Sequence, residues 1–208
     1  SNCHMETNVW IVTVGSWMYY GASGAAYINR WGYIGGYWYY FPSNGIAYRN
    51  TEALIDGKEY RFDNDGHLFM NYIHRNANGS FAYGSDGAKV KNSWAKIGGK
   101  WYWANAQGNL VKGWVRVNGN EYLFDSYNAL YVNTVVETTH LDKTGYVAMS
   151  SDGVLFKNRW FQAEWTGSDG SRHKRWSYAG ADSFLYRSAS YTIGGKTYKF
   201  DAYGIWIG

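Results

Sequence analysis

The chain has 208 residues and a net charge of only +4 without a basic stripe, which argues against a nucleic-acid-binding protein. One cysteine excludes an internal disulfide framework, and no apolar run approaches the roughly 20 residues that span a bilayer, so we expect no membrane insertion. Aromatic residues make up 20% of the chain and Gly occurs 26 times, which favours short strands joined by glycine turns over packed helices.

Residues 1–9 resemble a cloning remnant or leader, and we expect them to lie outside the fold. From residue 10 onward, glycines recur every 21 residues, often after Asn or Asp, a dipeptide that supplies positive φ at a tight reversal. A unit of this length with three turns is too short for a strand–helix–strand unit and has no helical periodicity. The sequence therefore predicts an all-β solenoid of stacked β-hairpin repeats of about 21 residues. The glycines that define the period are Gly24, Gly45, Gly66, Gly87 and Gly108.

The period divides the chain into segments. Residues 10–133 form a regular β-hairpin repeat array, and additional residues at 134–143 predict an irregular connector. The turn motif resumes at Ser151-Asp152-Gly153, so we expect residues 144–208 to hold further, less regular repeats of the same array.

Within each repeat, four positions of the second strand sort into two faces, because side chains alternate along a strand. The second and fourth positions are apolar in nearly every repeat, as in Tyr39 and Phe41, and we expect them to face the core. The first and third positions vary from Trp38 and Tyr40 to charged residues such as Glu59. A position that accepts Glu is exposed, so Trp and Tyr at the first and third positions are candidates for ligand contact.

A second Trp column lies seven residues before the first position in three repeats, an offset that can place two indoles on one face of a hairpin. Trp114 and Trp160 occupy this column without that partner, and Trp176 with Tyr178 is the equivalent pair of an irregular repeat. Polar side chains near the aromatic platforms complete the set. The candidate ligand-binding residues are Trp10, Trp17, Tyr19, Trp31, Trp38, Tyr40, Trp94, Trp101, Trp103, Gln107, Lys112, Trp114, Trp160, Trp176 and Tyr178.

Catalytic and metal-binding patterns are absent from the sequence. No Gly-x-Ser-x-Gly or His-Glu-x-x-His motif occurs, and His67 and His74 are too far apart for a helical metal pair. Carboxylates such as Asp63 and Asp65 fall in predicted turns, where Asp serves local hydrogen bonding. We therefore expect no enzymatic activity, no cofactor and no metal.

The aromatic repeats resemble a known superfamily. Gly36-Tyr37-Trp38-Tyr39-Tyr40-Phe41, Gly99-Lys100-Trp101-Tyr102-Trp103 and Lys112-Gly113-Trp114 are similar to the cell-wall-binding repeats of Gram-positive surface proteins, which include choline-binding modules and glucan-binding domains. The resemblance implies a non-catalytic module of a secreted or bacterial cell-surface protein. In the choline-binding branch it implies an aromatic box made of a Trp pair and an aromatic residue of the next hairpin.

Three functional hypotheses follow. Exposed aromatic faces stack on sugars, so the first is a module that binds an α-glucan or another cell-wall polysaccharide. Such faces also attract quaternary ammonium groups, so the alternative is an anchor for choline-bearing teichoic acid. The third is a structural or protein-binding solenoid. The sequence leaves the oligomeric state open.

Overall fold

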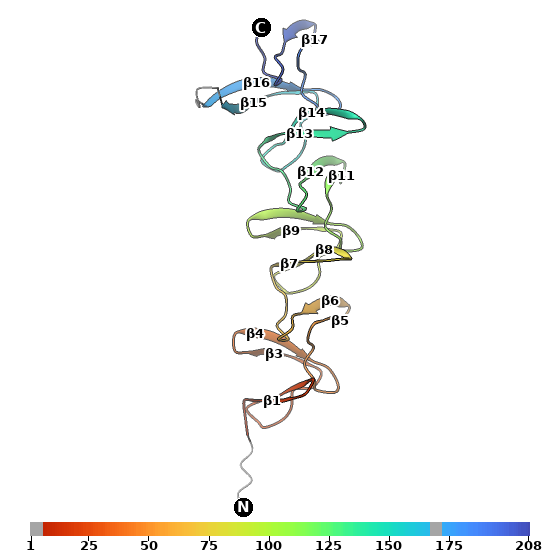
Figure 1. Cartoon of the computed structure of the whole chain (residues 1–208), viewed down its shortest axis with the longest axis vertical. Coiled ribbons are helices and arrows are strands. Elements are labelled where there is room, and N and C mark those ends of the chain that lie inside the picture. The colour runs from red at the N-terminus through yellow and green to blue at the C-terminus, as the bar shows by residue number, and fades with distance from the viewer. Residues whose placement is uncertain (1–5, 167–171) are drawn as a thin grey trace, which may run out of the picture. The chain divides into compact units, whose positions relative to one another are not determined.

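The computed structural model describes residues 6–166 and 172–208 (Figure 1). In this part of the chain, consecutive strands pair into nine two-stranded sheets, so the predicted all-β fold of hairpin repeats is confirmed. The first strand begins at Val9, whereas residues 1–5 of the predicted leader and residues 167–171 of the irregular repeat lie outside the described residues. Within those residues, no helix has the length and apolar character that crossing a membrane requires.

The chain divides into two compact units, Ser1–Gly99 with Trp103–Leu110, and Lys100–Tyr102 with Val111–Gly208. Residues of β10 (Lys100–Ala104) belong to both units. The other strands of the first unit are β1 (Val9–Thr13), β2 (Ser16–Tyr20), β3 (Arg30–Ile34), β4 (Tyr37–Phe41), β5 (Thr51–Ile55), β6 (Lys58–Phe62), β7 (Tyr72–Asn76), β8 (Gly79–Tyr83) and β9 (Ser93–Ile97). Those of the second unit are β11 (Gly113–Val117), β12 (Asn120–Phe124), β13 (Val135–His140), β14 (Lys143–Ala148), β15 (Arg159–Thr166), β16 (Arg172–Ala179), β17 (Ser190–Ile193) and β18 (Lys196–Lys199).

A two-residue turn closes the hairpin of β5 and β6. Asp56 and Gly57 join β5 to β6 with φ of 49° and 78°, and positive φ at both central residues is the hairpin turn whose twist matches that of the strands. The predicted irregular connector at 134–143 is wrong, because most of it is β13 and its turn. Leu141 and Asp142 adopt the same turn with φ of 47° and 64°, and a turn without glycine gave no signal in the sequence.

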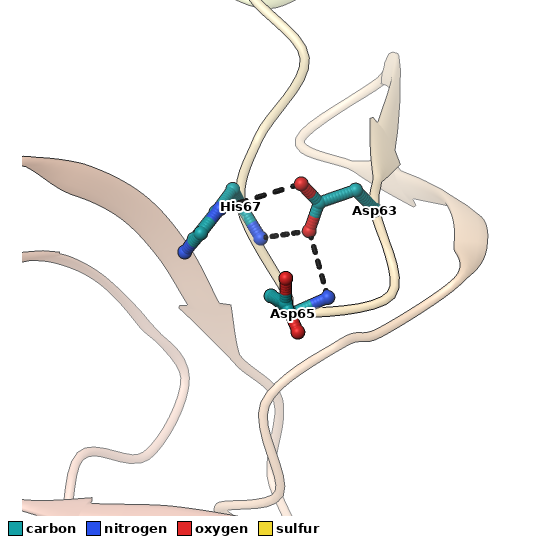
Figure 2. A group of neighbouring side chains, drawn as sticks. All are labelled: Asp63, Asp65 and His67. Carbon is teal, nitrogen blue, oxygen red and sulfur yellow. Dashed lines mark hydrogen bonds and ion pairs between the residues drawn. The ribbon is translucent and has the colours of Figure 1, made fainter.

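A side-chain oxygen organises the turn that follows several hairpins, as Figure 2 shows for Asp63. Its Oδ1 accepts hydrogen bonds from the backbone N–H of Asp65 (2.9 Å) and of His67 (2.8 Å), and its Oδ2 lies 3.3 Å from Nδ1 of His67. The cluster of two carboxylates and an imidazole is therefore accounted for by local turn chemistry. The same pair of backbone bonds recurs at Asn105, Asp125 and Asp201.

Consecutive hairpins are joined by one recurring hydrogen bond. The backbone N–H of Leu68, in the connector that follows β6, donates to the carbonyl of Trp38 in the preceding hairpin at 2.9 Å. A lone two-stranded hairpin is marginally stable in water, so this contact between neighbours holds the repeats together. The equivalent donor and acceptor pairs are Ala47 and Trp17, Lys89 and Glu59, Leu110 and Ser80, Leu130 and Trp101, Leu155 and Glu121, Leu185 and Tyr146, and Trp206 and Trp176.

The predicted faces are confirmed for the hairpins that carry Trp38 and Trp101, whereas the second position is only half-buried at Tyr60 and Tyr198. Trp38 and Trp101 are 38% and 41% exposed, whereas Tyr39 and Tyr102, at the second position, are each 7% exposed, and Phe41 at the fourth is fully buried. Alternation along the strand therefore separates an outer from an inner face, as expected.

The third position is not an exposed platform, and this prediction is wrong. Tyr19 is buried, Tyr40 is half-buried, and Ala82 and Leu123 at equivalent positions are buried. The reason is that the connector folds back over this position. The N–H of Tyr27 donates to the carbonyl of Tyr19 at 2.8 Å, and the two rings meet edge to face at 5.1 Å.

Ion pairs also link neighbouring hairpins. The carboxylate of Glu59 in β6 contacts Lys91 and lies 3.2 Å from Nζ of Lys89, both in the connector of the next hairpin. The hydrogen bond from Lys91, with the further contribution of Lys89, lowers the pKa of Glu59 below its ordinary value. Glu121 repeats the arrangement, with Nζ of Lys157 at 2.9 Å.

Replacing Phe62 by Ala should lower the free energy of unfolding by about 3–5 kcal/mol, because this ring is fully buried and its loss leaves a cavity. The control is Leu54→Ala in the same hairpin, where the side chain is 71% exposed and the change should stay within about 0.5 kcal/mol. Urea unfolding followed by circular dichroism measures both, and equal losses would contradict the assignment of the core.

Acidification should destabilise the protein through Glu59. A carboxylate whose folded pKa is lowered contributes stability that is complete above its unfolded pKa of about 4.3 and is lost as the pH falls through the folded value. The urea midpoint of the wild type should therefore fall more steeply below about pH 4.5 than that of Glu59→Gln. Lys91→Gln should flatten the profile in the same direction, and parallel profiles for all three proteins would refute this role.

Candidate functional site

An aromatic pair stands on the hairpin of β3 and β4. Trp31 lies opposite Tyr40, and Trp38 lies opposite Tyr33, so the two indoles are diagonal neighbours on one face of the hairpin. Their ring centroids are 6.5 Å apart and their planes meet at 83°. The seven-residue offset thus brings these two predicted residues together, as the sequence indicated.

The next hairpin supplies a third ring. Tyr60 in β6 lies 4.9 Å from Trp31 at an interplanar angle of 69°. We call Trp31, Trp38 and Tyr60 the second box. A pocket of about 420 Å³ opens between them and is also lined by Leu68, Met70, Ser85 and Asp86. Leu68 is held there by its backbone bond to Trp38, so the contact that joins the hairpins also completes the pocket.

The wall of the second box includes a carboxylate. Asp86 accepts hydrogen bonds from Nζ of Lys58 at 3.0 Å and from the N–H of Ala88 at 3.0 Å. The bond from Lys58, followed by that from Ala88, lowers the pKa of Asp86, so its side chain is ionised at neutral pH. Three aromatic rings and a carboxylate around one pocket favour an organic cation, because the ring faces are electron-rich.

The second unit contains an equivalent group, which we call the last box: Trp160 in β15, Trp176 in β16 and Tyr198 in β18. Trp160 lies 6.5 Å from Trp176 at 81°, and 4.9 Å from Tyr198 at 67°. Trp206 adds a fourth ring at 6.1 Å from Trp160. Its backbone N–H donates to the backbone carbonyl of Trp176. Trp176 is 43% exposed, so the box is open to solvent.

Trp10, Trp17 and Tyr39 form a further group, the first box, at the start of the first unit. Trp10 lies 6.0 Å from Trp17 at 69°, and 4.9 Å from Tyr39 at 63°. The guanidinium carbon of Arg49 lies 3.9 Å from the ring centroid of Trp17, so this box already contacts a cation of the chain itself.

Trp114 is not placed in an aromatic box. Its ring stacks on His140 at 4.3 Å and 17°, contacts Phe184 at 5.9 Å, and packs against a buried cluster of the second unit. Seven residues further on stands Glu121, which is ion-paired to Lys157 and Arg116. The indole of Trp114 therefore stabilises the repeat stack.

Three of the remaining predicted residues, Tyr19, Tyr40 and Tyr178, each contact a box Trp of their own hairpin, with ring centroids 5.2, 5.1 and 5.3 Å apart. Tyr178 packs on Tyr186 as Tyr40 packs on Tyr48, and Trp103 lies 5.2 Å from Trp94. Trp94 and Trp101 belong to different units, so their pairing stays a prediction. Gln107 and Lys112 are exposed and line neither the second nor the last box.

Sequence reasoning missed Tyr60, Tyr198, Met70 and Asp86. Tyr60 and Tyr198 occupy the second position, which was assigned wholly to the core, although both are half-buried and reach the box of the preceding hairpin. Their signal was present, because each follows an outer Trp by 22 residues. Met70 and Asp86 come from connectors, for which the strand pattern makes no prediction.

Comparison with known proteins agrees with this architecture. Residues 29–47 and 92–110 match the family described as the putative cell wall binding repeat, and no curated protein matches the chain. The choline-binding domain of CbpL from Streptococcus pneumoniae superposes with a TM-score of 0.69 at 19% identity, over 98% of both chains. The modular autolysin LytC from the same organism, in complex with a synthetic peptidoglycan ligand, gives 0.59 at 20% identity, over 92% of this chain and 45% of that one.

A third solved structure has a higher sequence identity. Choline binding protein F from Streptococcus pneumoniae, in the presence of a peptidoglycan analogue, is 31% identical over 71% of this chain and 46% of its own, with a TM-score of 0.54. The chain thus spans less than half of this protein and of LytC. Both matched segments begin at an Asn in the left-handed conformation and continue through the outer Trp pair. The matched repeats and the shared hairpin architecture confirm the resemblance seen in the sequence: the chain carries repeats of the cell-wall-binding family.

Proposed function

We propose that this chain is a non-catalytic module that attaches a bacterial cell-surface protein to choline-bearing teichoic acid. The observation that carries the proposal is the ring geometry of the second box, in which two nearly perpendicular indoles and a tyrosine line a pocket with an ionised carboxylate in its wall. A trimethylammonium group is a compact cation and can contact several ring faces at once, each contributing about 0.5–2 kcal/mol. The last box repeats these angles within a few degrees.

The same geometry supports the choice of choline over a glucan. A sugar ring stacks on one flat aromatic face and takes hydrogen bonds around its rim, whereas the rings of the second box stand edge to face, and the side-chain oxygens that line the pocket are limited to those of Tyr60, Ser85 and Asp86. The solved relatives named as choline-binding support this choice. Several weak sites on one chain gain affinity for a polymer through avidity, by about 10²–10⁴ where the spacing allows.

Trp38→Ala and Trp176→Ala should each weaken choline binding at their own box by about 2–30-fold, the loss of one ring face from a cation site. The double variant should show this weakening at both boxes. Tryptophan fluorescence titration with choline chloride measures the affinity, and Tyr203→Ala, an exposed turn residue, is the control that should leave it unchanged.

Titration with isomalto-oligosaccharides tests the polysaccharide hypothesis in the same samples. Fluorescence that responds to the oligosaccharide but not to choline would replace the choline proposal with glucan binding. No change in fluorescence with either ligand would favour a structural or protein-binding role.

A further inference from the structure

The first box has the same aromatic walls as the second. The distance from Trp10 to Tyr39 is 4.9 Å, as is that from Trp31 to Tyr60, and the corresponding interplanar angles are 63° and 69°. The two Trp pairs are 6.0 Å and 6.5 Å apart. If the aromatic rings alone decided binding, the first box would bind the same cation as the second.

The two boxes differ in the side chain that the next connector brings to them. Ala47 and Leu68 donate equivalent backbone bonds to Trp17 and Trp38, so the connectors are in register. Two residues further on stand Arg49 in the first box and Met70 in the second. The guanidinium of Arg49 lies over the ring of Trp17 at 3.9 Å, while its Nε donates to the carbonyl of Asn64 at 2.8 Å.

We call this place, two residues after the connector residue that bonds to the outer strand, the gate position. Arg187 at the gate position lies over the ring of Tyr146 at 5.7 Å and donates to the carbonyl of Thr144. Lysines at the gate position pair with Glu59 and with Glu121, which replace the outer Trp. The gate residues are Arg49, Met70, Lys91, Lys112, Val132, Lys157, Arg187 and Gly208.

Four of the five cationic gate residues thus contact the outer residue of the preceding hairpin. Arg49 and Arg187 do so where that residue is aromatic, and Lys91 and Lys157 where it is Glu. In contrast, the gate residues of the second and last boxes are Met70 and Gly208, neither of which has a cationic side chain.

We propose that Arg49 is an internal cation that closes the first box, and that the gate residue decides which aromatic boxes accept an external quaternary ammonium group. The guanidinium of Arg49 occupies the ring face of Trp17 that an external cation would contact. Because Arg49 is part of the chain, its effective concentration at this ring is high, and a free ligand has to compete with it. This inference rests on the proposed choline function, and it adds which boxes are used.

Isothermal titration calorimetry with choline chloride tests the gate in the full chain. Arg49→Met, which copies the gate of the second box, should add one choline equivalent per chain, with a Kd within about tenfold of the wild-type sites. Arg75→Met removes the same charge from an exposed position of β7 and should leave the stoichiometry unchanged. Circular dichroism confirms that each variant is folded.

The reverse variant provides an independent test. Met70→Arg should close the second box and remove one choline equivalent, and the two substitutions together should restore the wild-type number. A wild type that binds choline, with no change in stoichiometry in either variant, would overturn the gate and leave the proposed function standing. A wild type that does not bind choline would overturn the proposed function, and the gate with it.

Discussion

The architecture depends on the hydrogen bond that a connector amide donates to the outer strand of the preceding hairpin. Each hairpin is an isolated two-stranded sheet, which buries too little apolar surface to be stable alone. The bond from Leu68 to Trp38 and its equivalents fix the register between neighbours, so the second-position ring of one hairpin meets the Trp of the one before. The same contact also places Leu68 in the pocket of the second box, so the residues that join the hairpins also shape the proposed site.

Much of the fold was accessible from the sequence because its signals are local. Turn glycines, Asn residues with positive φ and strict alternation predicted the hairpins and the exposure of Trp38 over Tyr39. The turn at Leu141 and Asp142 was not predicted, because it contains no glycine and its conformation is imposed by the pairing of β13 with β14. The burial of Tyr19 was not predicted either, because the connector that covers it does not affect the alternation of residues along the strand.

The candidate site was only partly accessible for a related reason. Trp31 and Trp38 share one hairpin, so their proximity follows from strand geometry alone. Tyr60 and Met70 reach the pocket from later segments, and recognising them requires the register between repeats, 22 and 32 residues after Trp38. A Trp pair by itself does not distinguish the boxes, because the pair at Trp10 and Trp17 has a similar geometry but contacts the guanidinium of Arg49.

Each box is built from two neighbouring hairpins, because two of its rings belong to one hairpin and the third to the next. Tyr39 completes the box of the preceding hairpin. Trp38, the adjacent residue in the same strand, belongs to the box that the following hairpin completes. Gene duplication or loss of a single 21-residue unit would therefore alter recognition on both sides of the junction. A change in which units adjoin would change the number of complete boxes, even while every unit keeps its own residues.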